Sequence, residues 1–562
     1  MKKIIATLLI TFSIFSMNAQ ESIPQQTNID KIFSRWDAKD APGGTVGIIK
    51  DGKLIFAKGY GMANLDHNIP NDPKTVFSIA STSKQFTAAS IILLSEQGKL
   101  SLEDTLMKFF PNFPDYANEV TVQHLLNHTS GVRDYIILAR LSGLTVDDYY
   151  TNEIVEKLLT NQQELNFTPG DEYLYSNSGY WLLGQIVEKV SGLTLAEFAK
   201  KNIFDPLEMN DTHFNDNQNQ IVKNRATGYR PDRKGGYYIY NTKLNMIGDG
   251  GVITNVSDLE KWDATFYNSN LFNQGFWDKM TENGILNDGS KIQYAKGLNI
   301  NTYKGLKTIT HSGAFVGYRT EFIRFPEAQF SVIILANRTD TNPTRMAYKI
   351  ADLFLEDQYK KEKRTQTKKT SPEIKDFKSI TLTEKELNAF EGSYWDGKNK
   401  MSRKLEVRND TLNYVRNDGS ATMMVPISKN KFKMIGPRIS VICEMSSNGN
   451  TKEFTLNLPN AAPLTYVAYK PITEYSETDL ESYSGDYYSK ELDAVYTLKT
   501  KKDRILLFVK GNPIGEVKPI MKDVISIRSR QTFEFNKERT AFRLSMLGRV
   551  KNIKFVKKYS RL

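Results

Sequence analysis

Apolar residues recur along the first part of the chain with the spacing of helices. This spacing predicts helices over residues 24–40, Gln85–Gln97, Gly179–Val190 and Pro343–Glu356. Gly98 directly follows the second of these segments, and glycine is the residue that most often ends a helix. We therefore expect a mostly helical middle that extends to about residue 270.

Short apolar runs predict strands on both sides of this helical middle. Near the start, residues 46–57 predict a hairpin that turns at Asp51-Gly52, a strong two-residue turn signal. Later, strand-like runs cover Gly297–Thr302, Thr308–His311, Tyr318–Phe325 and Phe330–Asn337. Strands at both ends with helices between them predict one antiparallel sheet flanked by helices. Residues 20–358 should thus form one α+β domain.

The pattern changes after residue 358. Residues 359–379 are rich in lysine, show no apolar period, and predict a linker. Beyond them come short alternating strands, and the segment Leu387–Trp395 recurs in similar form as Leu480–Tyr488. This repeat predicts two small all-β barrel modules, over residues 380–473 and 474–562.

The first residues have the features of an export signal. Lys2-Lys3 form a basic start, residues 4–15 an apolar core, and Ala19 a small residue at the cleavage point. These features predict a signal peptide over residues 1–19. Since no cysteine lies near the cleavage point, a lipid anchor is not expected. We expect a periplasmic or secreted protein.

The net charge of +11 is unevenly distributed, because the part after Gln358 is strongly basic and the part before it slightly acidic. For an exported protein, this charge favours an anionic cell-envelope surface over nucleic acid as a partner, and no nucleic-acid-binding motif is present. A charge that serves solubility alone is the alternative interpretation. The single cysteine, Cys443, cannot form an internal disulfide. It lies in a strand-like apolar run and is expected to be buried and structural.

The segment Ser81-Thr82-Ser83-Lys84 is a candidate for nucleophilic catalysis. One helical turn separates Ser81 from Lys84, so the amine can reach the hydroxyl. A desolvated lysine can remove the proton of a serine, which is a poor nucleophile until it is deprotonated. The helix that follows also directs backbone N–H groups toward a developing oxyanion.

Two further segments carry candidate chemistry. Tyr175 precedes the helix at Gly179, and a tyrosine beside a lysine can transfer a proton. Asn177 can orient both the lysine and a substrate carbonyl. His311 lies at the predicted end of a strand and is followed by Ser312-Gly313-Ala314. There Gly313 would let a substrate approach the strand edge, and the Ala314 N–H would be a second oxyanion donor.

In this order, S-x-x-K, Y-x-N and H-x-G resemble the serine β-lactamase and penicillin-binding protein superfamily. The closest likeness is to class C β-lactamases and to their D-aminopeptidase, esterase and DD-carboxypeptidase relatives. Further segments share it: Phe77–Ala80, Leu125–Gly131, Tyr175–Gly184 and Gly248–Gly251. The resemblance covers residues 25–357 and implies a β-lactamase/transpeptidase-like fold. D-aminopeptidases of this type also have two C-terminal β-barrels.

The resemblance implies a role for each matching position. Ser81 would be the acylated nucleophile, Lys84 and Tyr175 the proton-transfer pair, and His311 the third-motif residue. Substrate would be bound by Asn177, Gly313 and Ala314. No metal or cofactor is implied, and the substrate would be a small peptide, ester or β-lactam.

One departure bears on the substrate. Many relatives have Lys-Thr-Gly as the third motif, whereas this chain has His311-Ser312-Gly313. A histidine is mostly neutral at pH 7, which weakens the case for a substrate carboxylate and favours D-aminopeptidase- or esterase-like activity. Class C-like β-lactamase, carboxylesterase and non-catalytic peptidoglycan- or peptide-binding protein remain alternatives.

Two other patterns carry less weight. His124 and His128 are four residues apart, but no H-E-x-x-H glutamate accompanies them, and a metal site there is not expected. The chain also has no G-x-S-x-G elbow, which argues against an α/β-hydrolase.

Overall fold

The computed structural model describes residues 24–559, apart from positions 146, 269–270, 360–378, 417–418, 436–440, 449–450, 458–462, 473 and 528–530. The predicted signal peptide and nearly all of the predicted linker lie outside the described residues. No described helix combines the length and the apolar character needed to cross a membrane.

A six-stranded antiparallel sheet organises the first part of the chain, in the order β10-β11-β12-β13-β1-β2. Its strands are β1 (Gly44–Lys50), β2 (Lys53–Tyr60), β10 (Asn299–Tyr303), β11 (Leu306–Phe315), β12 (Tyr318–Phe325) and β13 (Phe330–Ala336). β1 pairs with β13, which joins the two ends of the domain as predicted. The hairpin turns at Asp51-Gly52, where φ is 51° and 74°.

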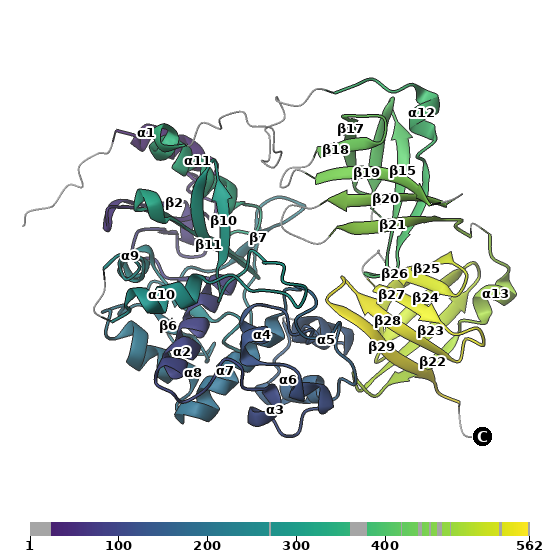
Figure 1. The fold of residues 1–562 in the computed structure, drawn as a ribbon, viewed down its shortest axis with the longest axis horizontal. Coiled ribbons are helices and arrows are strands. Elements are labelled where there is room, and N and C mark those ends of the chain that lie inside the picture. The colour runs from purple at the N-terminus through teal and green to yellow at the C-terminus, as the bar shows by residue number, and fades with distance from the viewer. Residues whose placement is uncertain are drawn as a thin grey trace, which may run out of the picture.

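Helices cover both faces of this sheet (Figure 1). On one face, α1 (Gln26–Phe33) and α11 (Pro343–Leu355) pack against Val46, Ile48 and Val332 in a dry core. α1 is shorter than the predicted helix over residues 24–40. It ends where Trp36 packs on Phe33, with ring centroids 5.0 Å apart, and Ala38 is the one apolar residue between Trp36 and Ala41.

The opposite face carries the larger helical half. Its helices are α2 (Lys84–Glu96), α3 (Leu106–Phe109), α4 (Val122–Leu126), α5 (Tyr135–Leu141), α6 (Asn152–Thr160), α7 (Asn177–Ser191), α8 (Leu195–Ala199), α9 (Val256–Ala264) and α10 (Gln274–Thr281). Short strands lie between them: β3 (Met62–Asn64), β4 (Ile69–Pro70), β5 (Phe77–Ser78), β6 (His213–Phe214), β7 (Tyr229–Pro231), β8 (Tyr237–Ile239) and β9 (Val252–Thr254).

β11 differs from its prediction in a way that affects the site. The strand was expected to end at His311, but it continues to Phe315, and Gly313 pairs with Thr320 of β12. The reason is that β12 provides backbone partners for the whole segment, so the turn falls at Val316-Gly317. His311-Ser312-Gly313 therefore lies within a strand and not at the end of a hairpin.

Two closed eight-stranded barrels follow, as predicted. The first contains β14 (Gly392–Asp396), β15 (Met401–Arg408), β16 (Thr411–Val415), β17 (Ala421–Pro426), β18 (Lys431–Ile435), β19 (Val441–Asn448), β20 (Thr451–Asn457) and β21 (Leu464–Tyr469). The second contains β22 (Gly485–Ser489), β23 (Ala494–Lys501), β24 (Arg504–Val509), β25 (Asn512–Met521), β26 (Val524–Ile527), β27 (Gln531–Phe535), β28 (Ala541–Met546) and β29 (Val550–Lys557).

The sequence repeat marks equivalent positions in the two barrels. A short helix precedes each, α12 (Glu384–Asn388) and α13 (Glu477–Glu481). Tyr394 donates to the Phe390 carbonyl at 2.7 Å, and Tyr487 donates to the Tyr483 carbonyl at 3.0 Å. In each copy, therefore, a buried tyrosine fastens the first strand to the segment before it. Cys443 is buried in the first barrel, as expected.

The second barrel packs against α5 and α6 of the first domain (Figure 1). Its apolar core is continuous with that of the helical half. Buried polar bonds cross the contact: Tyr496 donates to the Leu141 carbonyl at 2.8 Å, and Arg133 pairs with Glu491 at 2.5 Å. This contact fixes the barrel beside the cleft that Ser81 lines.

Candidate active site

Ser81 lies in a tight 3-10 turn, Ala80–Ser83, that leads directly into α2. The turn is fastened to the sheet by Thr82, whose hydroxyl contacts Thr320 at 3.0 Å and donates to the His311 carbonyl at 3.2 Å. Ser83 accepts a hydrogen bond from the Val252 N–H at 3.0 Å. Ser81 is thus held between β11 and the start of α2. The S-x-x-K pattern predicts the second of these positions.

Lys84 is fully buried beneath Ser81. Its Nζ lies 3.3 Å from Ser81 Oγ. It also donates to Asn177 Oδ1 at 3.1 Å and to the backbone carbonyl of Asp249. If the two N–H bonds of a neutral amine serve these latter two acceptors, its lone pair faces the serine hydroxyl. The geometry suits a base that takes the serine proton.

The electrostatics of Lys84 agree with this geometry. Burial lowers the pKa of its amine from 10.5 to about 8, although the carboxyl groups of Asp249 and Asp134 act in the opposite direction. About one tenth of the amine is therefore neutral at pH 7, a far larger fraction than in an exposed lysine.

This pKa leads to a prediction on pH dependence. Protonated Lys84 cannot accept the Ser81 proton, so kcat/KM should rise about tenfold per pH unit below about pH 8 and level off above it. The rise should be measured with an uncharged ester, so that the substrate itself does not titrate. A profile that stays flat between about pH 6 and pH 9 would contradict the assignment of Lys84 as the base.

Tyr175 lies just before α7 and faces the same hydroxyl. Its ring centroid is 4.9 Å from Lys84 Nζ. Burial raises its pKa, and a hydrogen bond with Ser81 opposes this only in part. Tyr175 is therefore protonated at neutral pH and suited to donate a proton. The imidazole of His128 supports its ring, with centroids 4.2 Å apart.

Asn177 is oriented by Asp134, which the sequence analysis did not identify. Asp134 Oδ2 accepts from both the backbone N–H and the side-chain amide of Asn177 at 2.9 Å. Its other oxygen caps α5, accepting from the Ile136 and Ile137 N–H groups at 3.1 and 3.2 Å. Because the amide nitrogen is held by Asp134, the amide oxygen is directed to Lys84.

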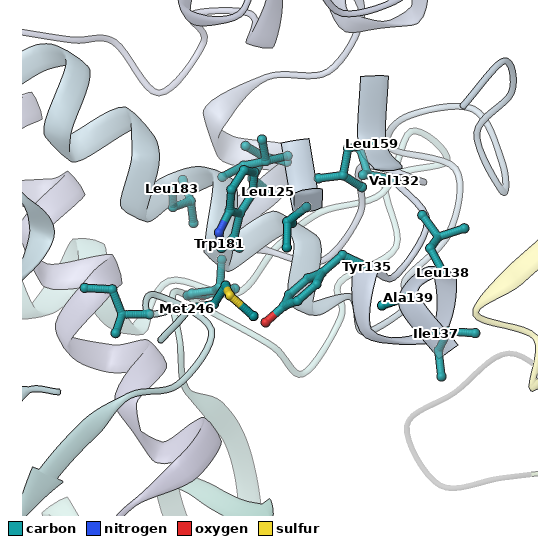
Figure 2. Close-up of a cluster of buried hydrophobic side chains, with 14 of the residues drawn as sticks. Leu125, Val132, Tyr135, Ile137, Leu138, Ala139, Leu159, Trp181, Leu183 and Met246 are labelled. Carbon is teal, nitrogen blue, oxygen red and sulfur yellow. The ribbon is translucent and has the colours of Figure 1, made fainter. Parts of the chain in front are cut away.

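Tyr135, at the start of α5, orients Asp249 through a hydrogen bond, as Asp134 orients Asn177. Figure 2 shows its ring packed in the buried cluster with Trp181, Leu125 and Met246. Its hydroxyl donates to Asp249 Oδ2 at 3.1 Å. Burial raises the pKa of this carboxyl to about 6. The hydrophobic core thereby positions Asp249, whose backbone carbonyl accepts a hydrogen bond from Lys84 Nζ.

His311 is buried at the site and is neutral. Burial and the nearby Lys84 lower its pKa to about 3. Its Nδ1 donates to the Ser312 carbonyl at 2.7 Å, so its Nε2 accepts from the Tyr294 hydroxyl at 3.0 Å. His311 therefore cannot supply a positive charge to the substrate.

Gly313 permits a close contact that the sequence did not predict. A Cβ at this position would lie 2.2 Å from the Ile79 carbonyl oxygen and from Thr320 Oγ1. The glycine therefore allows β11 to approach the Ser81 turn, and Gly313 is not among the residues that line the cavity. Its neighbour Ala314 does line the cavity, as Ser81 does.

These residues surround a cavity of about 500 Å³. Ser81, Tyr175, Asn177, His311 and Ala314 all line it, as the three motifs together predict. The wall also contains residues that the motifs did not reveal: Tyr173, Arg225, Tyr294 and, from the second barrel, Arg549. Asp249 belongs to the Gly248–Gly251 segment, which was noted without a role. No sequence signal marked Arg549.

The two histidines considered as metal ligands have other partners. His124 Nδ1 accepts from the Thr121 N–H at 3.2 Å, which completes a helix cap. His128 Nδ1 accepts from the Ser176 N–H at 3.2 Å. The described part of the chain contains no group of three or more His, Cys, Asp or Glu side chains placed to hold a metal ion.

Comparisons with known proteins cover the first domain above all. Residues 29–355 match the family model described as Beta-lactamase. Penicillin-binding protein 4* of Bacillus subtilis is 31% identical over 346 residues, which is 59% of this chain and 76% of that protein. D-aminopeptidase of Brucella anthropi is 27% identical over 315 residues, 56% of this chain and 59% of the relative. The chain thus spans about three fifths of that D-aminopeptidase.

Two solved structures resemble the chain with sequence identities close to those of the relatives above. The octameric penicillin-binding protein homologue from Pyrococcus abyssi has a TM-score of 0.53 and 26% identity, covering 79% of this chain and 98% of that one. A penicillin-binding protein from Bacillus halodurans has a TM-score of 0.51 and 29% identity, covering 58% of this chain and 99% of that one.

Proposed function

Because the chain belongs to the beta-lactamase family, we propose that it is an exported serine hydrolase acting on peptides, amides or esters of D-amino acids. The observation that carries the proposal is the contact of Lys84 Nζ with Ser81 Oγ at 3.3 Å, made by a fully buried lysine whose pKa is lowered. A binding protein gains nothing from a buried lysine beside a serine. Such a lysine has a clear use as a base.

The reaction would run in two steps. Ser81 Oγ attacks the substrate carbonyl while Lys84 takes its proton, and the oxyanion is stabilised by the N–H groups of Ser81 and Ala314. The C–N or C–O bond then breaks, and Tyr175 gives its proton to the leaving group. Lys84 holds the proton that restores Tyr175. Water next attacks the acyl-enzyme with the same groups, releasing the acid.

The nucleophile is tested by labelling. A fluorophosphonate should attach to Ser81 of the folded protein, as located by mass spectrometry, and Ser81→Ala should take up no label. Absence of labelling on folded wild-type protein would contradict the assignment as an enzyme. A non-catalytic binding protein would then be the better interpretation.

The preference for D-amino acids rests on the likeness to D-aminopeptidase of Brucella anthropi. It is tested by comparing D-alanyl and L-alanyl anilides, each with a free and with an acylated amine, using Ser81→Ala as the blank. Faster cleavage of the D forms supports the proposal. Equal rates for both enantiomers would contradict the preference for D-amino acids and would indicate a general esterase or amidase.

A further inference from the structure

Arg549 enters the active-site cavity from the second barrel. It follows the tight turn between β28 and β29, in which Leu547 and Gly548 have φ of 55° and 69°. The turn is bonded to the first domain at its backbone: the Arg549 carbonyl accepts from Asn166 Nδ2 at 2.8 Å and from the Asp134 N–H at 3.4 Å. The position of this residue is therefore set by the domain that holds Ser81.

The guanidinium of Arg549 lies over Tyr175, 5.4 Å from the ring centroid. The side chain is half-buried, and none of the described acidic side chains forms an ion pair with it. Arg543 on the same barrel differs, since it pairs with Glu164 across the interface at 3.4 Å. A guanidinium that is partly removed from water and lacks a carboxylate partner is a ready site for an anion.

The charges along the cavity wall favour the same kind of ligand. Arg225 and Arg549 both line the cavity, and the acidic side chain among the lining residues is Asp249. That carboxyl accepts a hydrogen bond from the Tyr135 hydroxyl at 3.1 Å, and its charge can offset only one of the two arginines. His311 is neutral. Two guanidinium groups thus face one carboxyl group among the lining residues, a balance that favours a substrate carboxylate over an ammonium group.

The two arginines contact different residues of the cavity wall. Arg225 bonds Gln218 at 3.0 Å and lies near Tyr318. Arg549 lies over Tyr175, the residue that would protonate the leaving group. A cation beside the proton donor is within reach of the part of the substrate that departs.

We propose that Arg549 determines specificity by binding a carboxylate on the leaving group, so that the preferred substrates have a free C-terminal residue directly after the scissile bond. This inference rests on the proposed function and adds a substrate class to it. It assigns to a residue of the barrel the positive charge that His311 cannot provide.

The test compares two substrates that differ in one group: an N-acyl D-alanyl-D-alanine and the same compound with a C-terminal amide. Wild-type protein should prefer the carboxylate by about 10- to 100-fold in kcat/KM. Arg549→Gln should remove most of this preference by raising KM for the carboxylate substrate alone, and Arg549→Lys should restore part of it. Arg543→Gln, on the same interface but away from the cavity, is the matched control and should behave as wild type.

Binding provides a readout that does not depend on turnover. In the Ser81→Ala background, calorimetry should show tighter binding of the carboxylate ligand, and adding Arg549→Gln should abolish the difference. Equal binding of the two ligands, or an equal loss for both substrates on Arg549→Gln, would overturn the inference. If wild-type protein binds the carboxylate ligand selectively but hydrolyses neither substrate, the carboxylate-binding role of Arg549 is supported and the proposed function is contradicted.

Discussion

Replacing Lys84 with methionine is expected to lower kcat by about 10³- to 10⁴-fold for both ester and amide substrates. Methionine fills a similar volume but cannot take the proton of Ser81, which lies 3.3 Å from the lysine nitrogen. Steady-state kinetics measure the loss, and the rate of labelling by a fluorophosphonate should fall with it.

The same substitution should not destabilise the protein. Lys84 has no carboxylate in ion-pair contact among the described residues, and its burial disfavours the charged form. An apolar side chain in its place avoids that desolvation cost, which offsets the loss of the hydrogen bonds to Asn177 and the Asp249 carbonyl, so the melting temperature should change by only a few degrees. A variant that loses activity together with many degrees of melting temperature would point to a structural role and contradict the assignment.

The second large effect is expected at the contact between the barrel and the first domain. Glu491→Ala would leave the guanidinium of Arg133, which is 1% exposed, without its buried carboxylate. Breaking such a pair typically costs about 3–5 kcal/mol. Scanning calorimetry should show a lower transition for the part of the molecule that contains this interface.

A matched control lies on the same interface. Asp493 pairs with Lys157 at 3.3 Å, but these side chains are 58% and 66% exposed. Asp493→Asn should therefore cost less than about 1 kcal/mol. If both variants shift the transition by the same small amount, the buried pair does not hold the barrel in place.

The sequence predicts those parts of the site that depend on local spacing. Ser81 and Lys84 face each other because one helical turn separates them, and the predicted partners Tyr175, Asn177 and His311 do reach the same cavity. Each belongs to a short motif that identifies it. The hairpin at Asp51-Gly52 and the repeated tyrosines of the barrels were likewise predictable from short patterns.

The remaining features depend on contacts between distant segments. β11 extends past His311 because β12 pairs with it, and Gly313 is needed because the Ile79 carbonyl lies against it. Arg549 belongs to no motif, and it reaches the cavity only because the second barrel docks on α5 and α6. The spacing of apolar residues within one segment carries no information on contacts between segments that are far apart in the sequence.

The wall of the cavity contains residues of both the first domain and the second barrel, and this has a consequence for the order in which the chain is synthesised and folded. A ribosome completes the Ser81 turn early, and domains generally fold in order from the N-terminus. The cavity, however, gains Arg549 only after the β28–β29 turn has been made and the second barrel has closed. A chain that stops between the two barrels would carry Ser81 and Lys84 in a cleft that lacks Arg549. The selectivity proposed for Arg549 would thus arise late, when the last barrel folds onto the first domain.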